Sequence, residues 1–204
     1  MGGDANLKTA ILLSGGMDSI SLAYWKRPDI AFTVDYGQLS AAGEIPAARV
    51  VSRKLDIAHE VIAVNCRELG SGDLAGKPHL EAAPATEWWP FRNQLLLTLA
   101  GARAIALGVN RLIFGSVKTD SFHKDGSAEF FEKISDLFFL QEGNLLVSAP
   151  AIHLTTAELV RISGLPRSLL AWAHSCHVSQ YACGYCGGCA KYYSVMKELG
   201  YETD

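Results

Sequence analysis

The chain has few cysteines, little net charge and no long apolar run. Of its 204 residues 5 are cysteine, and 18 lysines and arginines face 21 acidic residues, which gives a net charge of −3. Nucleic-acid-binding proteins usually carry an excess or a patch of positive charge, so this balance argues against that class. No segment has the roughly 20 consecutive apolar residues that cross a bilayer. Residues 1–8 lack the basic and apolar parts of a secretion signal, and we therefore expect a cytoplasmic protein with no nucleic-acid or membrane partner.

Apolar residues make up 49% of the chain, enough to pack the core of one domain over residues 1–204. Short apolar runs alternate with segments of helical period, which predicts an α/β fold with a doubly wound parallel sheet. The predicted strands are residues 9–13, 30–36, 60–65, 111–117 and 145–148, and the predicted helices are 20–25, 43–55, 93–107, 128–140, 155–163 and 190–199. Residues 66–90, rich in glycine and proline, are predicted to form a long loop.

The segment Ser14-Gly15-Gly16-Met17-Asp18-Ser19 follows the first predicted strand and precedes a predicted helix. A helix N-terminus offers free N–H groups and partial positive charge, and glycines let the backbone approach an anion, so this position suits phosphate. A carboxylate repels phosphate, and Asp18 is therefore interpreted as a magnesium ligand or as a cap of the loop. The alternative interpretation is an ordinary strand-to-helix turn with a serine or aspartate cap.

Four of the five cysteines lie close together near the C-terminus. Cys176, Cys183, Cys186 and Cys189 have the spacing C-x6-C-x2-C-x2-C, with glycines that allow tight turns between them. Without a secretion signal, this clustering indicates a metal site over residues 174–204 rather than disulfides. Zinc, an iron–sulfur cluster and a redox C-x2-C pair are all compatible with the spacing. His174 and His177 flank the first cysteine and are interpreted as surface or hydrogen-bonded histidines.

Several segments together resemble one family. Ser14–Ser19 resembles the S-G-G-x-D-S loop of the pyrophosphatase-loop ATP enzymes. Other segments are similar to the 7-cyano-7-deazaguanine synthases within that group. These are Asp35-Tyr36-Gly37-Gln38, Pro90-Phe91-Arg92-Asn93, Gly115 with Asp120, Asp125 with Glu129-Phe130, residues 150–158, and Ser175-Cys176 with the three later cysteines. The resemblance extends from Thr9 to about Gly200, which is nearly the whole chain.

The resemblance implies an adenine nucleotide alpha hydrolase-like, Rossmann-like fold and a C-terminal zinc site. It further implies a homodimer that uses ATP, Mg²⁺ and Zn²⁺. The implied reaction adenylates 7-carboxy-7-deazaguanine, converts it with ammonia to an amide, and dehydrates the amide to the nitrile with a second ATP. The implied zinc ligands are Cys176, Cys183, Cys186 and Cys189.

The same resemblance, with the chemistry of the side chains, gives the candidate site residues. Arg92 suits a phosphate or carboxylate because its planar fork binds two oxygens, and Asp125 suits the N–H groups of a guanine-like edge. The candidate catalytic residues are Asp18, Arg92 and Asp120. The candidate ATP-binding residues are Leu13, Ser14, Gly15, Gly16, Asp18, Ser19, Tyr36, Gln38, Arg92, Asn93 and Gly115. The candidate substrate-binding residues are Asp120, Phe122, Lys124 and Asp125.

The chain departs from the family pattern where the substrate is expected. Leu39-Ser40 stands in place of Arg-His, Thr156 in place of a lysine, and residues 120–127 are altered and one residue shorter. One alternative function is therefore ligation of the activated carboxylate to another amine, including one on a protein acceptor. A tRNA-modifying enzyme is a second alternative, and a nucleotide-binding or zinc scaffold without catalysis is a third.

Overall fold

The computed structural model describes residues 7–201 of the chain. Five parallel strands form one sheet in the order β3-β2-β1-β4-β5. The strands are β1 (Thr9–Leu12), β2 (Ile30–Asp35), β3 (Ala58–Ala63), β4 (Arg111–Ile113) and β5 (Leu146–Ser148). The chain builds outward from β1 to β3 and then returns to place β4 on the other side of β1. The sheet order therefore changes direction between β1 and β4, the place where open α/β sheets bind ligands.

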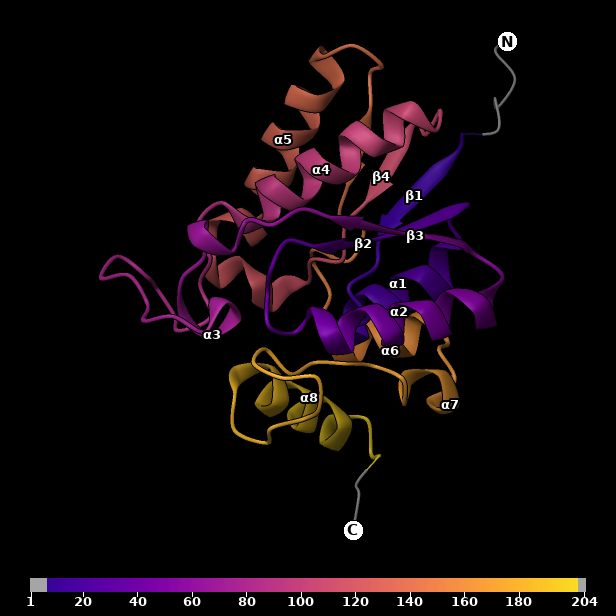
Figure 1. Cartoon of the computed structure of the whole chain (residues 1–204). Coiled ribbons are helices and arrows are strands. Elements are labelled where there is room, and N and C mark those ends of the chain that lie inside the picture. The colour runs from indigo at the N-terminus through magenta and orange to yellow at the C-terminus, as the bar shows by residue number, and fades with distance from the viewer. Residues whose placement is uncertain (1–6, 202–204) are drawn as a thin grey trace.

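Helices cover both faces of the sheet, in layers that are visible in Figure 1. The helices α1 (Met17–Lys26), α2 (Ala41–Leu55) and α6 (Thr156–Ser163) lie on one face, and α4 (Arg92–Ala106) and α5 (Ala128–Leu140) lie on the other. The short α7 (Arg167–Leu170) and the terminal α8 (Gly187–Glu198) lie beyond α6. This is the doubly wound α/β fold that the sequence predicts.

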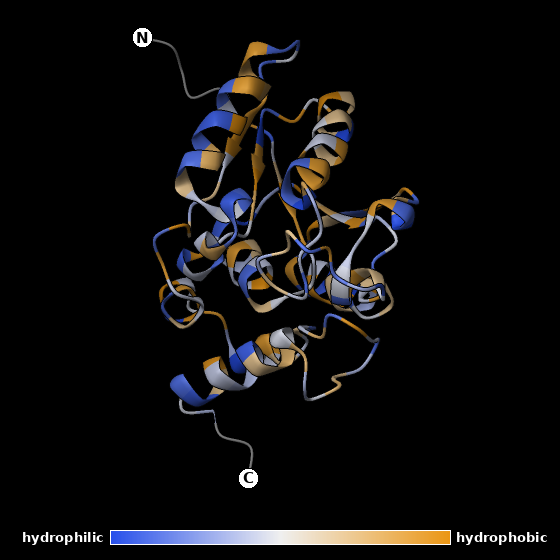
Figure 2. Cartoon of the chain, turned by 90° about the vertical axis from the view of Figure 1, so that its left-hand side faces the viewer, coloured by the Kyte–Doolittle hydropathy of each residue, from blue (hydrophilic) through white to orange (hydrophobic). Residues whose placement is uncertain are grey.

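Alternate residues of the central strand β1 pack into two separate hydrophobic cores, because successive side chains in a strand point to opposite faces of the sheet. Ile11 packs with Val51 of α2 and Leu159 of α6, whereas Leu12 packs with Leu97 of α4 and Phe131 of α5. The strands are mostly hydrophobic in colour in Figure 2, while the helices carry hydrophilic and hydrophobic residues mixed along their length. A strand buried on both faces fits a near-continuous apolar run.

The predicted elements are present, with differences at their ends. β4 stops at Ile113 rather than at 117, because residues 114–117 leave the sheet and form a loop beside Ser14–Ser19. α8 begins at Gly187, three residues before the predicted start. The long loop 66–90 contains a 3₁₀ turn (Arg67–Leu69) and the short α3 (Gly72–Ala75). The predicted domain 1–204 and zinc segment 174–204 both end in residues that lie outside the described part of the chain.

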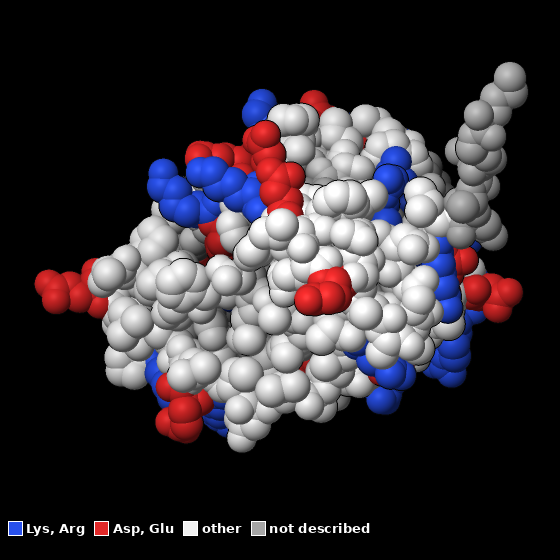
Figure 3. Space-filling view, turned by 90° about the horizontal axis from the view of Figure 1, so that it is seen from above, with Lys and Arg blue, Asp and Glu red and all other residues white. Residues whose placement is uncertain are grey.

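No helix within residues 7–201 is long and apolar enough to cross a membrane. Figure 3 views the molecule from above, and this face carries side chains of both charges, mostly near its edges.

Candidate nucleotide and metal sites

A cavity of about 280 Å³ opens at the carboxyl ends of β1, β2 and β4. It thus lies where the sheet order changes direction. Of the candidate residues, the structure brings together Leu13, Ser14, Gly16, Asp18, Ser19, Tyr36, Arg92, Asn93, Gly115 and Asp120 along its wall. Gly15, Gln38, Phe122, Lys124 and Asp125 do not line it.

The segment Ser14–Ser19 curls into the start of α1. The hydroxyls of Ser14 and Ser19 lie 3.2 Å apart, and the Ser19 hydroxyl donates to the Gly16 carbonyl at 3.0 Å. No side chain caps the N-terminus of α1, so its first-turn N–H groups stay available to a ligand. Both hydroxyls and this helix end face the cavity. The arrangement suits an anion such as a phosphate.

Gly15 shapes this loop from behind rather than touching the cavity. Its φ of +78° is in the left-handed region that side chains avoid. A Cβ at this position would lie 2.8 Å from the Glu44 carbonyl oxygen and 2.9 Å from the Ala47 Cβ. The carbonyl of Gly15 also accepts a hydrogen bond from the backbone N–H of His174 at 2.8 Å. The loop is therefore fixed by α2 on one side and by the cysteine segment on the other.

Asp18 and Asp120 share one ammonium group. The Lys191 Nζ lies 2.9 Å from the Asp18 Oδ2 and 3.5 Å from the Asp120 Oδ1. The Asp18 Oδ1 is buried and has no hydrogen-bond partner among the described residues. Burial raises the pKa of Asp18, and the nearby ammonium only partly opposes this. Burial lowers the pKa of Lys191, but the two carboxylates outweigh it and the net pKa is raised, so the ammonium stays charged.

Asp120 is held in place by its own loop. Its Oδ2 accepts the Val117 backbone N–H at 3.0 Å and the Ser116 hydroxyl at 3.4 Å. Gly115 packs against the first turn of α1, where a Cβ would lie 3.4 Å from the Ser19 backbone. The loop after β4 thus aims one carboxylate oxygen into the cavity beside the phosphate-type loop.

Arg92 and Asn93 begin α4 on the opposite wall of the cavity. The preceding Phe91 has a φ of +54°, which is strained for a large side chain and is easiest for glycine. Asp125 reaches this helix end from its loop and accepts the Asn93 backbone N–H at 3.1 Å. The Asn93 side chain in turn donates to the Asp125 carbonyl at 2.8 Å. Asp125 is therefore placed behind the cavity, where it caps α4.

Gln38 also acts from behind the cavity wall. Its Oε1 accepts the Tyr36 backbone N–H at 2.9 Å, and its Nε2 donates to the Glu44 carboxylate at 2.8 Å. Burial raises the pKa of Glu44, while Gln38, Ser40 and the charge of Arg92 oppose this effect. Burial likewise raises the pKa of Tyr36 above its ordinary value, so the phenol stays neutral. Tyr36 and Glu44 thereby form an ordered polar part of the cavity wall, near enough to Arg92 for its charge to act on both.

The sequence missed four polar residues that line the cavity, namely Glu44, His123, His177 and Lys191. His123 faces the cavity, whereas its neighbour Phe122 is 65% exposed and Lys124 points elsewhere. His123 and His177 each have a buried Nδ1 without a hydrogen-bond partner among the described residues. Two unpaired ring nitrogens beside a cavity are candidates to bind a polar ligand. The spacing of apolar residues predicts helices, but it does not predict that His123 and His177 line the cavity.

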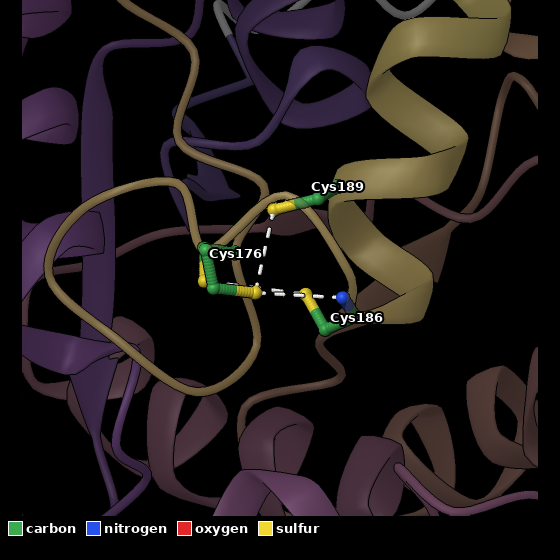
Figure 4. Close-up of side chains that lie close together, drawn as sticks. Cys176, Cys186 and Cys189 are labelled. Atoms are coloured by element: carbon green, nitrogen blue, oxygen red, sulfur yellow. Dashed lines mark hydrogen bonds between the residues drawn. The ribbon is translucent and has the colours of Figure 1, made fainter.

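The four cysteines converge at the start of α8, and Figure 4 shows Cys176, Cys186 and Cys189 pointing toward one another. All four sulfur atoms lie within 4.8 Å of one another. The separations are 3.9 Å for Cys183–Cys189 and 4.0 Å for Cys176–Cys186. No disulfide joins them.

Hydrogen bonds and burial shift the pKa values of two of these thiols in opposite directions. Burial works against the charge of Cys183, but backbone N–H groups of Tyr185 and Cys186 outweigh it and lower the pKa of Cys183 to about 6. Burial and the neighbouring thiols raise the pKa of Cys189 to about 12. The four sulfurs therefore cannot all be thiolates at neutral pH without a positive ion between them. The set fits one metal ion.

The fold and these two sites define a doubly wound α/β protein with a loop suited to an anion and four cysteines that could hold a metal ion. The family model of the queuosine biosynthesis protein QueC matches residues 8–200. The chain therefore belongs to the QueC family.

Curated relatives agree in length and name. The chain is 32% identical to the 7-cyano-7-deazaguanine synthase of Desulforudis audaxviator, over 95% of this chain and 98% of the relative. It is 33% identical to the enzyme of that name from Acidobacterium capsulatum, over 89% of this chain and 88% of the relative. It is 28% identical to the one from Porphyromonas gingivalis, over 93% and 92%. These relatives support an enzyme of queuosine biosynthesis.

One solved structure has the same fold. The U34-tRNA thiolase NcsA from Methanococcus maripaludis, which holds a [4Fe-4S] cluster, aligns with a TM-score of 0.56 at 15% identity. The alignment covers 95% of this chain and 66% of that one. At this identity the likeness supports the fold alone.

Proposed function

We propose that the protein uses ATP to convert 7-carboxy-7-deazaguanine into 7-cyano-7-deazaguanine. The observation that carries the proposal is the cavity in which the Ser14–Ser19 loop, two carboxylates and Arg92 face one another. An anion-binding loop at one end and a guanidinium at the other suit a reaction between a polyphosphate and a carboxylate.

In the first half-reaction, a carboxylate oxygen of the substrate attacks the α-phosphorus of ATP. The bond from that phosphorus to the bridging oxygen breaks, and pyrophosphate leaves with its electron pair. The Ser14 and Ser19 hydroxyls and the start of α1 bind the leaving pyrophosphate, and Arg92 pairs with the carboxylate or the α-phosphate. Ammonia then displaces AMP to give the amide. A second adenylation activates the amide oxygen, and loss of AMP and two protons gives the nitrile.

Asp18 and Asp120 fit a magnesium ion, because their oxygens face the cavity and the buried Asp18 Oδ1 has no protein partner within residues 7–201. When bound, magnesium neutralises phosphate charge. The apolar part of the cavity wall suits the planar ring of adenine or deazaguanine. It is formed by Phe32, Val34, Leu96 and Phe114. We also propose that Asp125, Phe122 and Lys124 contact the deazaguanine substrate.

Zinc is the metal that we propose for the cysteine site. Four thiolates at about 2.3 Å from one tetrahedral ion lie about 3.8 Å apart. Two of the sulfur–sulfur separations, 3.9 and 4.0 Å, are close to that value, and all four sulfurs lie within 4.8 Å of one another. An iron–sulfur cluster with four irons binds each thiolate to a different iron and thus needs a wider set. The family resemblance further suggests a homodimer, which sedimentation of the purified protein would test.

The reaction is tested by pyrophosphate release from ATP, with 7-carboxy-7-deazaguanine and ammonia, followed by mass analysis. We expect carboxylate-dependent release and a product with the mass of the nitrile; the matched control is 7-deazaguanine, which lacks the carboxylate. Release without nitrile, with the mass of an added amine or protein acceptor instead, would favour ligation to another amine. Nucleotide binding without any release would contradict an enzymatic role.

A further inference from the structure

Lys191 joins the two sites that the sequence keeps apart. It extends from α8, just past the last cysteine, to Asp18 in a contact that spans 173 residues of chain. The ammonium lies between Asp18 and Asp120, at 2.9 and 3.5 Å, and also lines the cavity. Its side chain is 40% exposed, yet its ammonium lies against the two carboxylates of the cavity rather than extending away from the protein.

The contact leaves an unbalanced group of charges. Two carboxylates share one ammonium, and the buried Oδ1 of Asp18 has no partner among the described residues. Carboxylates oppose phosphate binding unless cations screen them. The ammonium therefore occupies the position from which a divalent cation would bind both carboxylates.

We propose that Lys191 neutralises Asp18 and Asp120 while the cavity is empty and moves to the phosphate oxygens when magnesium and ATP enter. This inference rests on the proposed use of ATP. Asp18 and Asp120 would then hold the magnesium ion, and the ammonium of Lys191 would be free to reach the polyphosphate. The flexible four-carbon stem of lysine allows such a move without movement of the helix.

The helix that carries Lys191 is fixed at its base. Cys186 stands directly before α8, and Cys189 lies in its first turn, two residues before Lys191. The same segment donates from His174 to the Gly15 carbonyl. The cysteine site thus sets where the lysine begins, and the stem sets how far the ammonium reaches.

Thr156 offers a second observation. It is buried near Asp18, and its hydroxyl has no hydrogen bond of good geometry within residues 7–201. No other lysine or arginine of the described chain forms an ion pair with Asp18 or Asp120. Lys191 therefore supplies the positive charge on this side of the cavity, as Arg92 does on the other.

The test compares Lys191→Met with Lys197→Met, an exposed lysine on the same helix. The two readouts are binding of Mn²⁺ to the nucleotide-free protein and binding of α,β-methylene-ATP with Mg²⁺, both on protein of equal metal content. In Lys191→Met we expect Mn²⁺ to bind about tenfold more tightly and the nucleotide about ten- to a hundredfold more weakly. Lys197→Met should match the wild type.

An unchanged Mn²⁺ affinity or an unchanged nucleotide affinity in Lys191→Met would overturn the inference and leave the proposed function standing. Failure of the wild-type protein to bind the nucleotide would overturn both. Lys191→Arg keeps the charge, and its nucleotide affinity should lie within a few fold of the wild type. A loss in Lys191→Arg as large as in Lys191→Met would show that packing, not charge, is responsible and would also overturn the inference.

Discussion

The backbone N–H of His174 donates to the carbonyl of Gly15 at 2.8 Å, which connects the cysteine segment directly to the phosphate-type loop. His174 is also packed closely on α2, where a Cβ on Gly43 would lie 2.4 Å from its ring. The cysteine site therefore does more than stabilise the C-terminal segment. It supports the Ser14–Ser19 loop, which we propose binds the phosphates of ATP.

The link between His174 and Gly15 should couple the metal site to stability and to nucleotide binding. Removal of the metal, or Cys183→Ser, should lower the melting temperature by about 10 °C, which is about 3 kcal/mol for a chain of this size. Nucleotide affinity should fall as well, because His174 and α8 lose their anchor. Differential scanning fluorimetry and nucleotide titration measure the two effects. Cys66→Ser is the control, since Cys66 lies outside the cluster; full nucleotide affinity in the metal-free protein would contradict the link.

Gly15→Ala should destabilise the fold and disable the loop. The left-handed backbone and the close approach of Glu44 and Ala47 act together, so we expect a loss of about 2–4 kcal/mol in the free energy of unfolding. Gly164→Ala separates the two causes, because Gly164 has a φ of +68° but nothing within 4 Å of its added Cβ. That control should lose only about 1 kcal/mol. Equal losses in urea denaturation would show that the close contact contributes nothing.

Asp125 allows capping and substrate binding to be told apart. Asp125→Ala removes the acceptor for the Asn93 N–H and should cost about 1 kcal/mol of stability. Asp125→Asn keeps an acceptor oxygen and should unfold like the wild type. If the carboxylate also binds the N–H groups of the substrate, Asp125→Asn should raise KM for the deazaguanine about tenfold or more. An unchanged KM in Asp125→Asn would leave Asp125 a structural residue.

The sequence could predict the fold well because strands buried on both faces and helices of regular period leave clear apolar patterns. Ile11 and Leu12 face different cores, yet both are apolar. The apolar run between residues 9 and 13 is therefore enough to predict a strand that is buried on both faces. The phosphate-type loop could also be predicted, because its residues are consecutive.

Lys191 could not be predicted, because its partner Asp18 lies 173 residues away and a lysine on a terminal helix normally faces solvent. The available signal was its place two residues after Cys189 of the cysteine cluster. His123 was missed for a different reason. The 3₁₀ turns at Lys118–Phe122 and Lys124–Gly126 turn His123 inward and Phe122 outward, and no period in the sequence encodes that phase.

His59 should make stability depend on pH. Burial and the charge of Arg49 lower its pKa below the ordinary 6.5, and its Nε2 lies 2.8 Å from the Thr33 hydroxyl. The folded state therefore favours the neutral ring, and this contribution is complete above pH 6.5 and is lost as the pH falls through the lowered folded value. The free energy of unfolding of His59→Gln should fall less than that of the wild type between about pH 7 and 5. His79→Gln, at an exposed position, is the control, and a wild-type slope in His59→Gln would contradict the prediction.

The central claim is that a carboxylate oxygen of the substrate attacks the α-phosphorus of ATP. The most direct measurement uses 7-carboxy-7-deazaguanine labelled with ¹⁸O in its carboxylate, with ATP and ammonia, and mass spectrometry of the phosphate products. We expect ¹⁸O in AMP, because the bond between carbon and the transferred oxygen breaks when ammonia displaces it. ADP as the product with ¹⁸O in inorganic phosphate, or AMP without label, would contradict adenylation of the carboxylate.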